Sequence, residues 1–193
     1  CLDADCEVAP NYLPALEQHF REHPKATGAS ISFSHPLDKG YRHAILDFEL
    51  YLRYYKNALF WAGFPYAYHT IGSAMAVPCY TYQRVGGMNK QKAGEDFYFI
   101  EKLVYQGCFT ELNRTTVYPS PRQSLRVPFG TGQAVADYIA EEPDQLAVFN
   151  PQSFQELRNF MEQLPGLYQN SGVPKAELPP AIKAFLEERN WQY

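Results

Sequence analysis

The sequence predicts a mixed α/β fold, because segments with the apolar period of a strand alternate with segments that have the period of a helix. The chain has 193 residues, of which 46% are hydrophobic, and this is enough for one domain with a buried core. From residue 131 onward only helical patterns follow. We therefore expect an α/β domain over residues 1–132 and a helical extension over residues 133–193.

An amphipathic helix is expected from Pro10 to His23, where apolar residues recur at helical spacing. Its buried face is expected to carry Leu13, Leu16 and Phe20. His19 and His23 lie four residues apart, a spacing that suits a metal, but no third ligand is near them in the sequence. We therefore expect both histidines on a solvated face of this helix.

The expected strands lie at Thr27–Ser34 and Phe109–Tyr118, and a long helix lies between them at Tyr41–Ala62. That helix is expected to bury Ile45, Phe48, Leu52, Tyr55 and Leu59. The small-residue segment Gly72–Val77 predicts a further strand, which a short helix and a glycine turn connect to a helix that ends at Tyr105. Helices are expected in the extension at residues 134–141, 153–164 and 180–191.

Composition and charge argue against several classes of protein. The net charge is −4 and no basic tract occurs, so a nucleic acid is not expected as a partner. The 4 cysteines lack the C-x-x-C spacing, so neither a zinc site nor a disulfide framework is indicated, and a reducing, cytoplasmic setting is expected. The most apolar run, Ala58–Tyr68, contains Pro65 and is too short to span a bilayer.

Asp3 and Asp5 form an Asp-x-Asp pair. In an extended strand end, their side chains would share a face and lie roughly 7 Å apart. Two carboxylates at that spacing bind a hard divalent cation, alone or shared with a diphosphate. A polar strand end or a turn is also typical of this composition, so the pair alone leaves both interpretations open.

Glu95 and Asp96 stand at the start of the helix that ends at Tyr105. The helix dipole favours acidic side chains in a first turn and is expected to hold them ionised. An ionised carboxylate beside a cleft serves as a general base. Acidic residues are also common at the start of ordinary helices, so this pattern alone does not distinguish a catalytic base from a helix terminus.

A loop rich in proline, serine, arginine and glycine follows the last expected strand and contains Arg122 and Arg126. Arginine side chains match phosphate oxygens with paired hydrogen bonds, and backbone amides at a helix start bind anions. The loop therefore predicts a phosphate clamp. A proline-rich connector with solvated arginines is the alternative.

Three strings in this order resemble family 2 glycosyltransferases of the GT-A fold. Leu2–Asp5 resembles the Asp-x-Asp motif of that family, and Gly72–Val77 with Gly94–Asp96 resembles its acceptor-side block. Residues 119–132 are similar to a loop of some bacterial members. The Gln-x-x-Arg-Trp motif of processive polysaccharide synthases is absent, which favours transfer of a single sugar.

The resemblance implies a partial GT-A domain, which is Rossmann-like with α/β/α layers. Members of the family begin with several βα units that hold the nucleotide base and ribose, and none of these precedes Asp3 in the sequence. The chain is therefore expected to be the C-terminal half of such a domain, with the metal and acceptor sites, and to lack most of the donor site.

The resemblance also implies roles for individual residues. Asp5 would bind Mn²⁺ or Mg²⁺, and Asp3 would contact the ribose of the donor or the metal shell. Asp96 would be the general base toward the acceptor hydroxyl, and Glu95 would orient the acceptor or the base. Transfer would invert the anomeric carbon of the sugar.

The implied donor is a UDP- or GDP-sugar, whose diphosphate Arg122 and Arg126 would cover. The implied acceptor is a glycan or a lipid-linked glycan, as in polysaccharide biosynthesis. Peripheral membrane association and assembly into a homo-oligomer accompany this expectation. His69 would either assist the acceptor or the metal, or be a structural histidine.

Two other functions remain open. A phosphohydrolase of the haloacid dehalogenase type also has an Asp-x-Asp pair, in which the first aspartate is the nucleophile. In this sequence Cys6 and Glu7 follow the pair, whereas that family has a threonine or valine shortly after it. A non-catalytic carbohydrate-binding or scaffolding fragment would account for the aromatic content of 16%.

Overall fold

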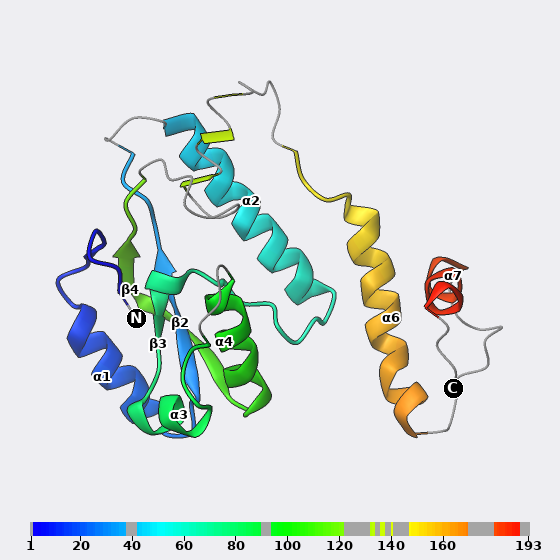
Figure 1. Cartoon of the computed structure of the whole chain (residues 1–193), viewed down its shortest axis with the longest axis horizontal. Helices are drawn as coiled ribbons and strands as arrows, with labels where there is room; N and C mark the ends of the chain where they lie inside the picture. The colour runs from blue at the N-terminus through cyan, green and yellow to red at the C-terminus, as the bar shows by residue number, and fades with distance from the viewer. Residues whose placement is uncertain are drawn as a thin grey trace. The chain divides into compact units, whose positions relative to one another are not determined.

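The mixed α/β class is confirmed by the computed structural model (Figure 1). The structure describes residues 2–37, 42–89, 94–121, 147–169 and 180–189, with a few residues between 132 and 140. The chain divides into two compact units: Cys1–Leu52 with Tyr68–Leu146, and Arg53–Ala67 with Ala147–Tyr193. The expected domain boundary after residue 132 stays a prediction.

A four-stranded sheet in the order β1-β4-β2-β3 forms the centre of the first unit. β2 (Gly28–Phe33) and β4 (Phe109–Tyr118) run parallel in its middle, so the strands expected there are confirmed. β1 (Glu7–Val8) and β3 (Met75–Ala76) are the outer strands, and they pair antiparallel with β4 and β2 respectively. The strand expected at Gly72–Val77 is shorter than predicted, because a 3₁₀ turn at Gly72–Ala74 precedes β3 and its small residues favour strands only weakly.

The helices begin and end close to their expected positions. In the first unit α1 spans Tyr12–Glu22, α3 spans Cys79–Arg84 and α4 spans Glu95–Tyr105. The long helix α2 spans Arg42–Trp61, and the second unit contains α6 (Pro151–Gln169) and α7 (Pro180–Glu188). The helix expected at residues 134–141 lies mostly outside the described residues. Within the described segments, no helix combines the length and apolar character that crossing a bilayer requires.

Two core clusters lie on opposite faces of the sheet. The first contains Tyr12, Ala29, Ile31, Phe33, Ala74, Leu112 and Val117. The second contains Met75, Phe99, Ile100, Leu103 and Phe109. Successive strand residues point to opposite faces, so Ala29 faces α1 while Gly28 faces α4. A Cβ atom at Gly28 would lie 3.2 Å from Leu103 of α4, and the absent side chain therefore lets α4 pack closely on the sheet.

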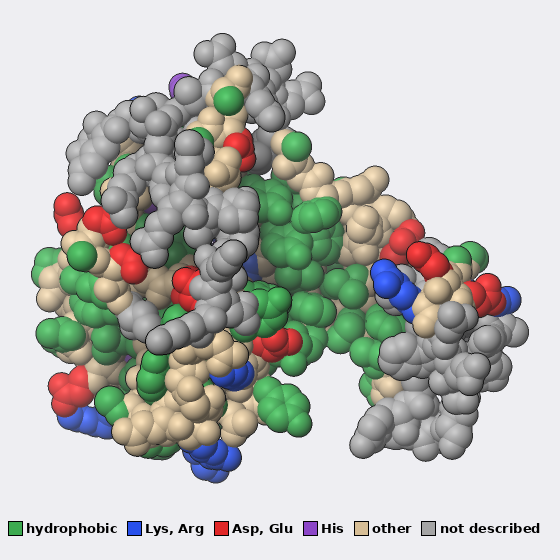
Figure 2. Space-filling view, in the orientation of Figure 1, with side chains coloured by type: hydrophobic (Ala, Val, Ile, Leu, Met, Phe, Trp, Pro, Cys, Tyr) green, Lys and Arg blue, Asp and Glu red, His purple; other side chains and the backbone are tan. Residues whose placement is uncertain are grey.

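The second unit is held together by aromatic rings. The Tyr54 hydroxyl donates a hydrogen bond to the Phe149 carbonyl at 2.7 Å, and the ring of Phe154 meets that of Tyr54 edge-on. The Arg158 guanidinium lies 4.7 Å from the centre of the Trp61 ring, a cation–π contact. On the face in view in Figure 2, the basic side chains of the described residues do not gather into one patch.

The predicted buried face of α1 is confirmed in part, since Leu16 and Phe20 pack against the first core cluster. Leu13, however, is 72% exposed, and the helix is turned so that Tyr12, Ala15 and His19 are its buried residues. The reason lies in β4, where the register with β2 jumps by several residues and residues 113–115 bulge. Asn11, just before α1, donates its amide to the Arg114 carbonyl at 2.8 Å and accepts a hydrogen bond from Thr115 at 3.0 Å. These bonds fix the helix on the bulge.

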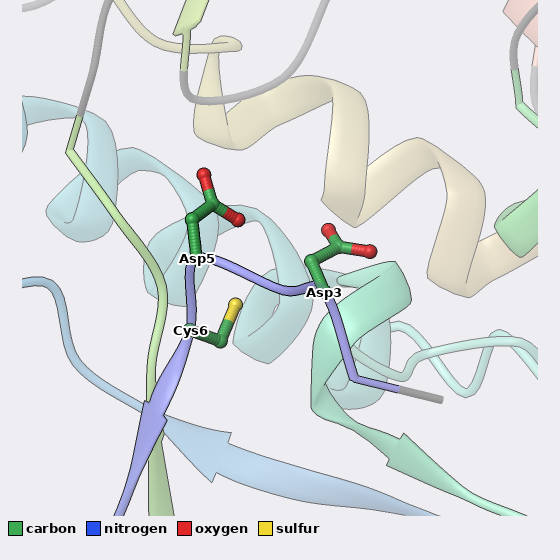
Figure 3. A group of neighbouring side chains, drawn as sticks. All are labelled: Asp3, Asp5 and Cys6. Atoms are coloured by element: carbon green, nitrogen blue, oxygen red, sulfur yellow. The ribbon is translucent and has the colours of Figure 1, made fainter.

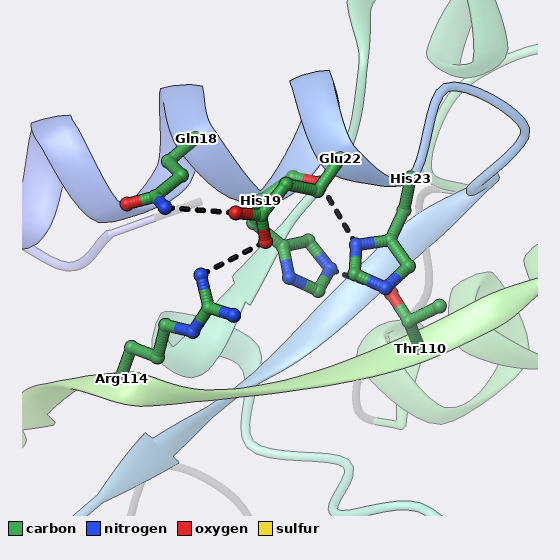
Figure 4. Close-up of polar contacts among 6 residues, drawn as sticks. All are labelled: Gln18, His19, Glu22, His23, Thr110 and Arg114. Atoms are coloured by element: carbon green, nitrogen blue, oxygen red, sulfur yellow. Dashed lines mark hydrogen bonds and ion pairs between the residues drawn. The ribbon is translucent and has the colours of Figure 1, made fainter.

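His19 is buried, so its predicted position on a solvated face is wrong, whereas His23 is exposed as predicted. Figure 4 shows the polar contacts around the two histidines. The Nε2 atom of His19 lies 2.9 Å from the Thr110 hydroxyl, which donates its own proton to the Gly28 carbonyl at 3.1 Å. The hydroxyl therefore accepts, and Nε2 carries the proton. The pKa of His19 is lowered, first by burial and then by the charges of His23 and Arg114. A neutral His19 thus joins α1 to β4.

We expect stability to fall on mild acidification because of His19. Folding lowers the pKa of His19, so the neutral imidazole favours the folded state. This contribution to folding stability is fully present above the unfolded pKa of 6.5 and is lost as the pH falls from there through the pKa of the folded state. His19→Gln keeps an N–H donor for Thr110 and removes the titration. Its melting temperature should fall less than that of the wild type between about pH 7 and about pH 5.

Thermal unfolding followed by circular dichroism over this pH range measures the difference. His43→Gln is the matched control, since His43 is exposed on α2 and should leave the pH dependence unchanged. Equal slopes for the wild type and His19→Gln would contradict the assignment.

Candidate functional site

Four of the predicted site residues lie at the end of the sheet where the parallel strands β2 and β4 finish: Asp3, Asp5, Glu95 and Asp96. β1 is antiparallel to β4 and pairs Glu7 with Tyr118, so the turn before β1 lies at this end. β3 is antiparallel to β2, so the 3₁₀ turn that precedes β3 lies there too. In open α/β sheets, ligands bind outside the carboxyl ends of the strands. The topology thus puts the candidate residues where such a fold offers a binding site.

Asp3 and Asp5 lie in a tight turn and not in the extended segment that was expected (Figure 3). The amide of Cys6 donates a hydrogen bond to the Asp3 carbonyl at 3.1 Å, which closes the turn. Aspartate favours turns because its side chain can bond to nearby backbone groups. One ligand atom each of Asp3, Asp5 and Cys6 therefore lies within 4.8 Å of the others.

Cys6 is a member of this group that the sequence motifs do not point to, because cysteine spacing draws attention only to pairs such as C-x-x-C. Its closeness to Asp3 follows from the turn, a local feature that the spacing of three residues allows. Carboxylates suit Mg²⁺ and Mn²⁺, whereas a thiolate suits softer metals. The donor set fits a divalent cation, and it fits Mn²⁺ better than Mg²⁺. Cys6 is also partly buried against the first core cluster.

The carboxylate of Asp96 lies directly against the backbone of Gly72. A Cβ atom at Gly72 would lie 2.5 Å from Cγ and Oδ1 of Asp96, and closer still to Oδ2. The carboxylate thus occupies the place that a side chain of residue 72 would take. Gly94 precedes α4 with a φ of 77°, a left-handed conformation that glycine adopts without steric penalty. This bend leads the chain into the first turn of α4, which carries Asp96.

The pKa of Asp96 is raised to about 6, first by burial and then by the negative charges of Glu95 and Asp3, while the chain's amino group lowers it. The shift is opposite to the one expected from the helix dipole, because desolvation and like charges favour the protonated form. Burial and charges cause this shift without a hydrogen bond from a described residue, and solvent reaches the carboxylate oxygens. Asp96 is therefore a half-buried acid that is mostly ionised at neutral pH and free to accept a proton.

Asp3, Glu95 and Asp96 belong to one electrostatic site, since the charges of the first two act on the third. Asp5 joins them through its closeness to Asp3. No family model, curated protein or solved structure matches this chain. The residues that resemble the glycosyltransferase motifs are therefore judged by their geometry alone, and that geometry brings the acidic turn and the first turn of α4 together.

The other predicted residues contribute less to the site. Arg122 and Arg126 lie outside the described residues. His69 is partly buried, and its ring meets the ring of Phe33 edge-on with 5.0 Å between the centroids. Phe33 is the last residue of β2, so His69 lies near the same edge of the sheet.

His35 and Glu49 form a buried pair at this edge that the sequence does not reveal. The backbone amide of His35 donates to Glu49 Oε1 at 2.6 Å, and its Nδ1 lies 2.8 Å from the same oxygen. The His35 side chain is fully buried. The pair ties the chain after β2 to α2, a contact between an expected loop and the middle of an expected helix.

We expect the Asp96 charge to lower the stability of the protein at neutral pH. Folding raises the pKa of Asp96 from 3.8 to about 6, so the protonated carboxyl favours the folded state. This contribution to folding stability is fully present below pH 3.8 and is lost as the pH rises through about 6. Asp96→Asn removes the charge and should raise the free energy of unfolding near pH 7 by on the order of 1 kcal/mol, allowing for solvent screening.

Urea unfolding near neutral pH measures this gain. Glu101→Gln removes an acid from the same helix outside its first turn and should change stability little. A loss of stability in Asp96→Asn would show that the carboxylate has a stabilising partner.

Proposed function

We propose that this chain carries the general base and the metal-binding turn of an inverting glycosyltransferase. Its donor is a UDP- or GDP-sugar, and its acceptor is a hydroxyl of a glycan or lipid-linked glycan. The observation that carries the proposal is the Asp96 carboxylate, which is unpaired among the described residues, has a pKa of about 6 and lies next to the acidic turn of Asp3 and Asp5.

Asp96 suits the role of general base. With a pKa of about 6 it is about nine-tenths ionised at pH 7, yet it holds a proton more firmly than an ordinary aspartate. In the proposed reaction it takes the proton of the acceptor hydroxyl. The acceptor oxygen then bonds to the anomeric carbon while the bond from that carbon to the diphosphate breaks on the opposite face. This displacement inverts the anomeric configuration.

Asp3, Asp5 and Cys6 suit the role of cation ligands. Their ligand atoms lie close enough to share one ion, and the two aspartates are exposed at the edge of the sheet where a diphosphate has access. A divalent cation held there supplies the positive charge that stabilises a leaving diphosphate. In this proposal the turn before β1 holds the donor end, and the first turn of α4 faces the acceptor.

The alternative functions fit these positions less well. A phosphohydrolase of the haloacid dehalogenase type has a threonine or valine shortly after its aspartate pair, whereas Cys6 and Glu7 follow Asp5 in this chain. A purely binding or scaffolding role gives no reason for a carboxylate whose pKa is raised to about 6 by burial and by two neighbouring acids. Both observations favour the transferase.

Calorimetric titration of the chain with UDP and with GDP tests the donor site. We expect binding in the presence of Mn²⁺ that EDTA abolishes, and at least about tenfold weaker binding in Asp5→Asn, because one ligand carboxylate is lost. Glu17→Gln, an exposed acid on α1, is the control and should bind as the wild type does. Nucleotide binding that is unaffected by metal and by Asp5→Asn would remove this turn from the site.

The rate of sugar transfer by the Asp96→Asn variant tests whether Asp96 is the general base. We expect turnover to fall by about 10²-fold or more, the usual contribution of a general base, while nucleotide affinity stays within about twofold of the wild type. The wild-type rate should decline on the acid side with a midpoint near pH 6, where Asp96 becomes protonated. Glu101→Gln should keep full turnover. An active Asp96→Asn variant would refute the assignment.

A further inference from the structure

We infer that Gly72 is a positioning residue: the missing side chain at this position forms the niche that holds the Asp96 carboxylate at the sheet edge. The inference rests on the proposed function only for its consequence in catalysis. Its structural content, that one glycine fixes where one carboxylate lies, stands by itself.

The need for glycine at position 72 is a need for space. Gly72 begins the 3₁₀ turn Gly72–Ala74, and its φ is not in the left-handed region, so alanine could adopt the same backbone. A Cβ atom there, however, would lie 2.5 Å or less from three atoms of the Asp96 carboxyl group. Carbon atoms do not approach so closely, so either the turn or the carboxylate must move.

The carboxylate is the part that can move with least cost. The 3₁₀ turn is fixed by the buried residues Ser73 and Ala74 and by the amide of Ala74, which donates to the Ile71 carbonyl at 2.9 Å. Asp96 is only half-buried, and no described residue holds its carboxylate by a hydrogen bond. Rotation about its side-chain bonds toward water therefore relieves the clash.

This movement has a measurable electrostatic signature. Burial is the largest cause of the raised pKa of Asp96, and the charged groups that act on it are Glu95 on its own helix, Asp3 in the turn before β1 and the chain's amino group. In Gly72→Ala the carboxylate gains water while these neighbours stay in place. Its pKa should therefore fall from about 6 toward the ordinary value of 3.8.

The first experiment is a titration of the Asp96 carboxyl carbon by NMR in the wild type and in Gly72→Ala. We expect a midpoint near 6 in the wild type and a midpoint lower by about one unit or more in the variant. Thr70→Ala is the control, because Thr70 is exposed two positions before Gly72 and should leave the Asp96 midpoint unchanged. An unchanged midpoint in folded Gly72→Ala overturns the inference.

A double-mutant cycle covers the case in which Gly72→Ala folds poorly. Gly72→Ala should change the melting temperature by a different amount in the wild-type background than in an Asp96→Ala background, because a carboxylate has to leave the niche only in the first. An equal change in both backgrounds would mean that residue 72 does not act on Asp96, and the inference would be wrong.

The catalytic consequence is tested separately. If Gly72 positions the base, Gly72→Ala lowers turnover, leaves nucleotide affinity unchanged and moves the acid limb of the rate profile below pH 6. If the titration and the cycle behave as expected and Asp96→Asn transfers sugar as fast as the wild type, the proposed function fails while the niche for Asp96 stands. The two failures are therefore distinguishable.

Discussion

The parallel pairing of β2 with β4 decides where every candidate residue lies. Because the two strands run parallel, their carboxyl ends reach the same edge, and the antiparallel partners β1 and β3 must begin there. The acidic turn before β1 and the 3₁₀ turn before β3 are thereby carried to one edge. α4 lies on one face of the sheet next to Gly28, and its first turn brings Asp96 against Gly72. Without this pairing, residues more than 90 positions apart would not share a site.

The elements of the fold were predictable where periodicity is strong, but the exact buried face of a helix was not. β2, β4, α2 and α4 lie close to where their apolar periods put them. Of the five residues expected to be buried on α2, however, only Ile45 is fully buried and the other four are partly exposed. In α1 the periodicity predicts burial of Leu13, yet the structure buries His19 and exposes Leu13. Hydrogen bonds from Asn11 and His19 to β4 decide the rotation, and their partners lie about 90 to 104 residues away. A pattern within one helix holds no information about such partners.

The same limit applies to the site. The types of Asp3, Asp5, Glu95 and Asp96 are visible in the sequence, but the closeness of the acidic turn to α4 follows from strand order, and the direction of the Asp96 pKa follows from burial. A first-turn aspartate in water would obey the helix dipole. Here desolvation and like charges outweigh it. The Cys6 thiol and the pair of His35 with Glu49 escape sequence inspection because a turn and a long-range contact create them.

The interactions at the end of the sheet that carries Asp96 lower the stability of the fold. A half-buried carboxylate without a hydrogen-bond donor among the described residues disfavours folding, and a second and third acid beside it add repulsion. Glycine in a 3₁₀ turn with ordinary dihedral angles is also less favourable than alanine, because its backbone loses more freedom on folding. Either feature alone would lower the stability slightly. The Asp96 carboxylate fills the space that a side chain at Gly72 would take, so the glycine explains where the carboxylate lies and the carboxylate explains why a glycine stands there. The two unfavourable features occur together because the glycine gives the Asp96 carboxylate a partly buried place, in which its pKa is higher than it would be in water.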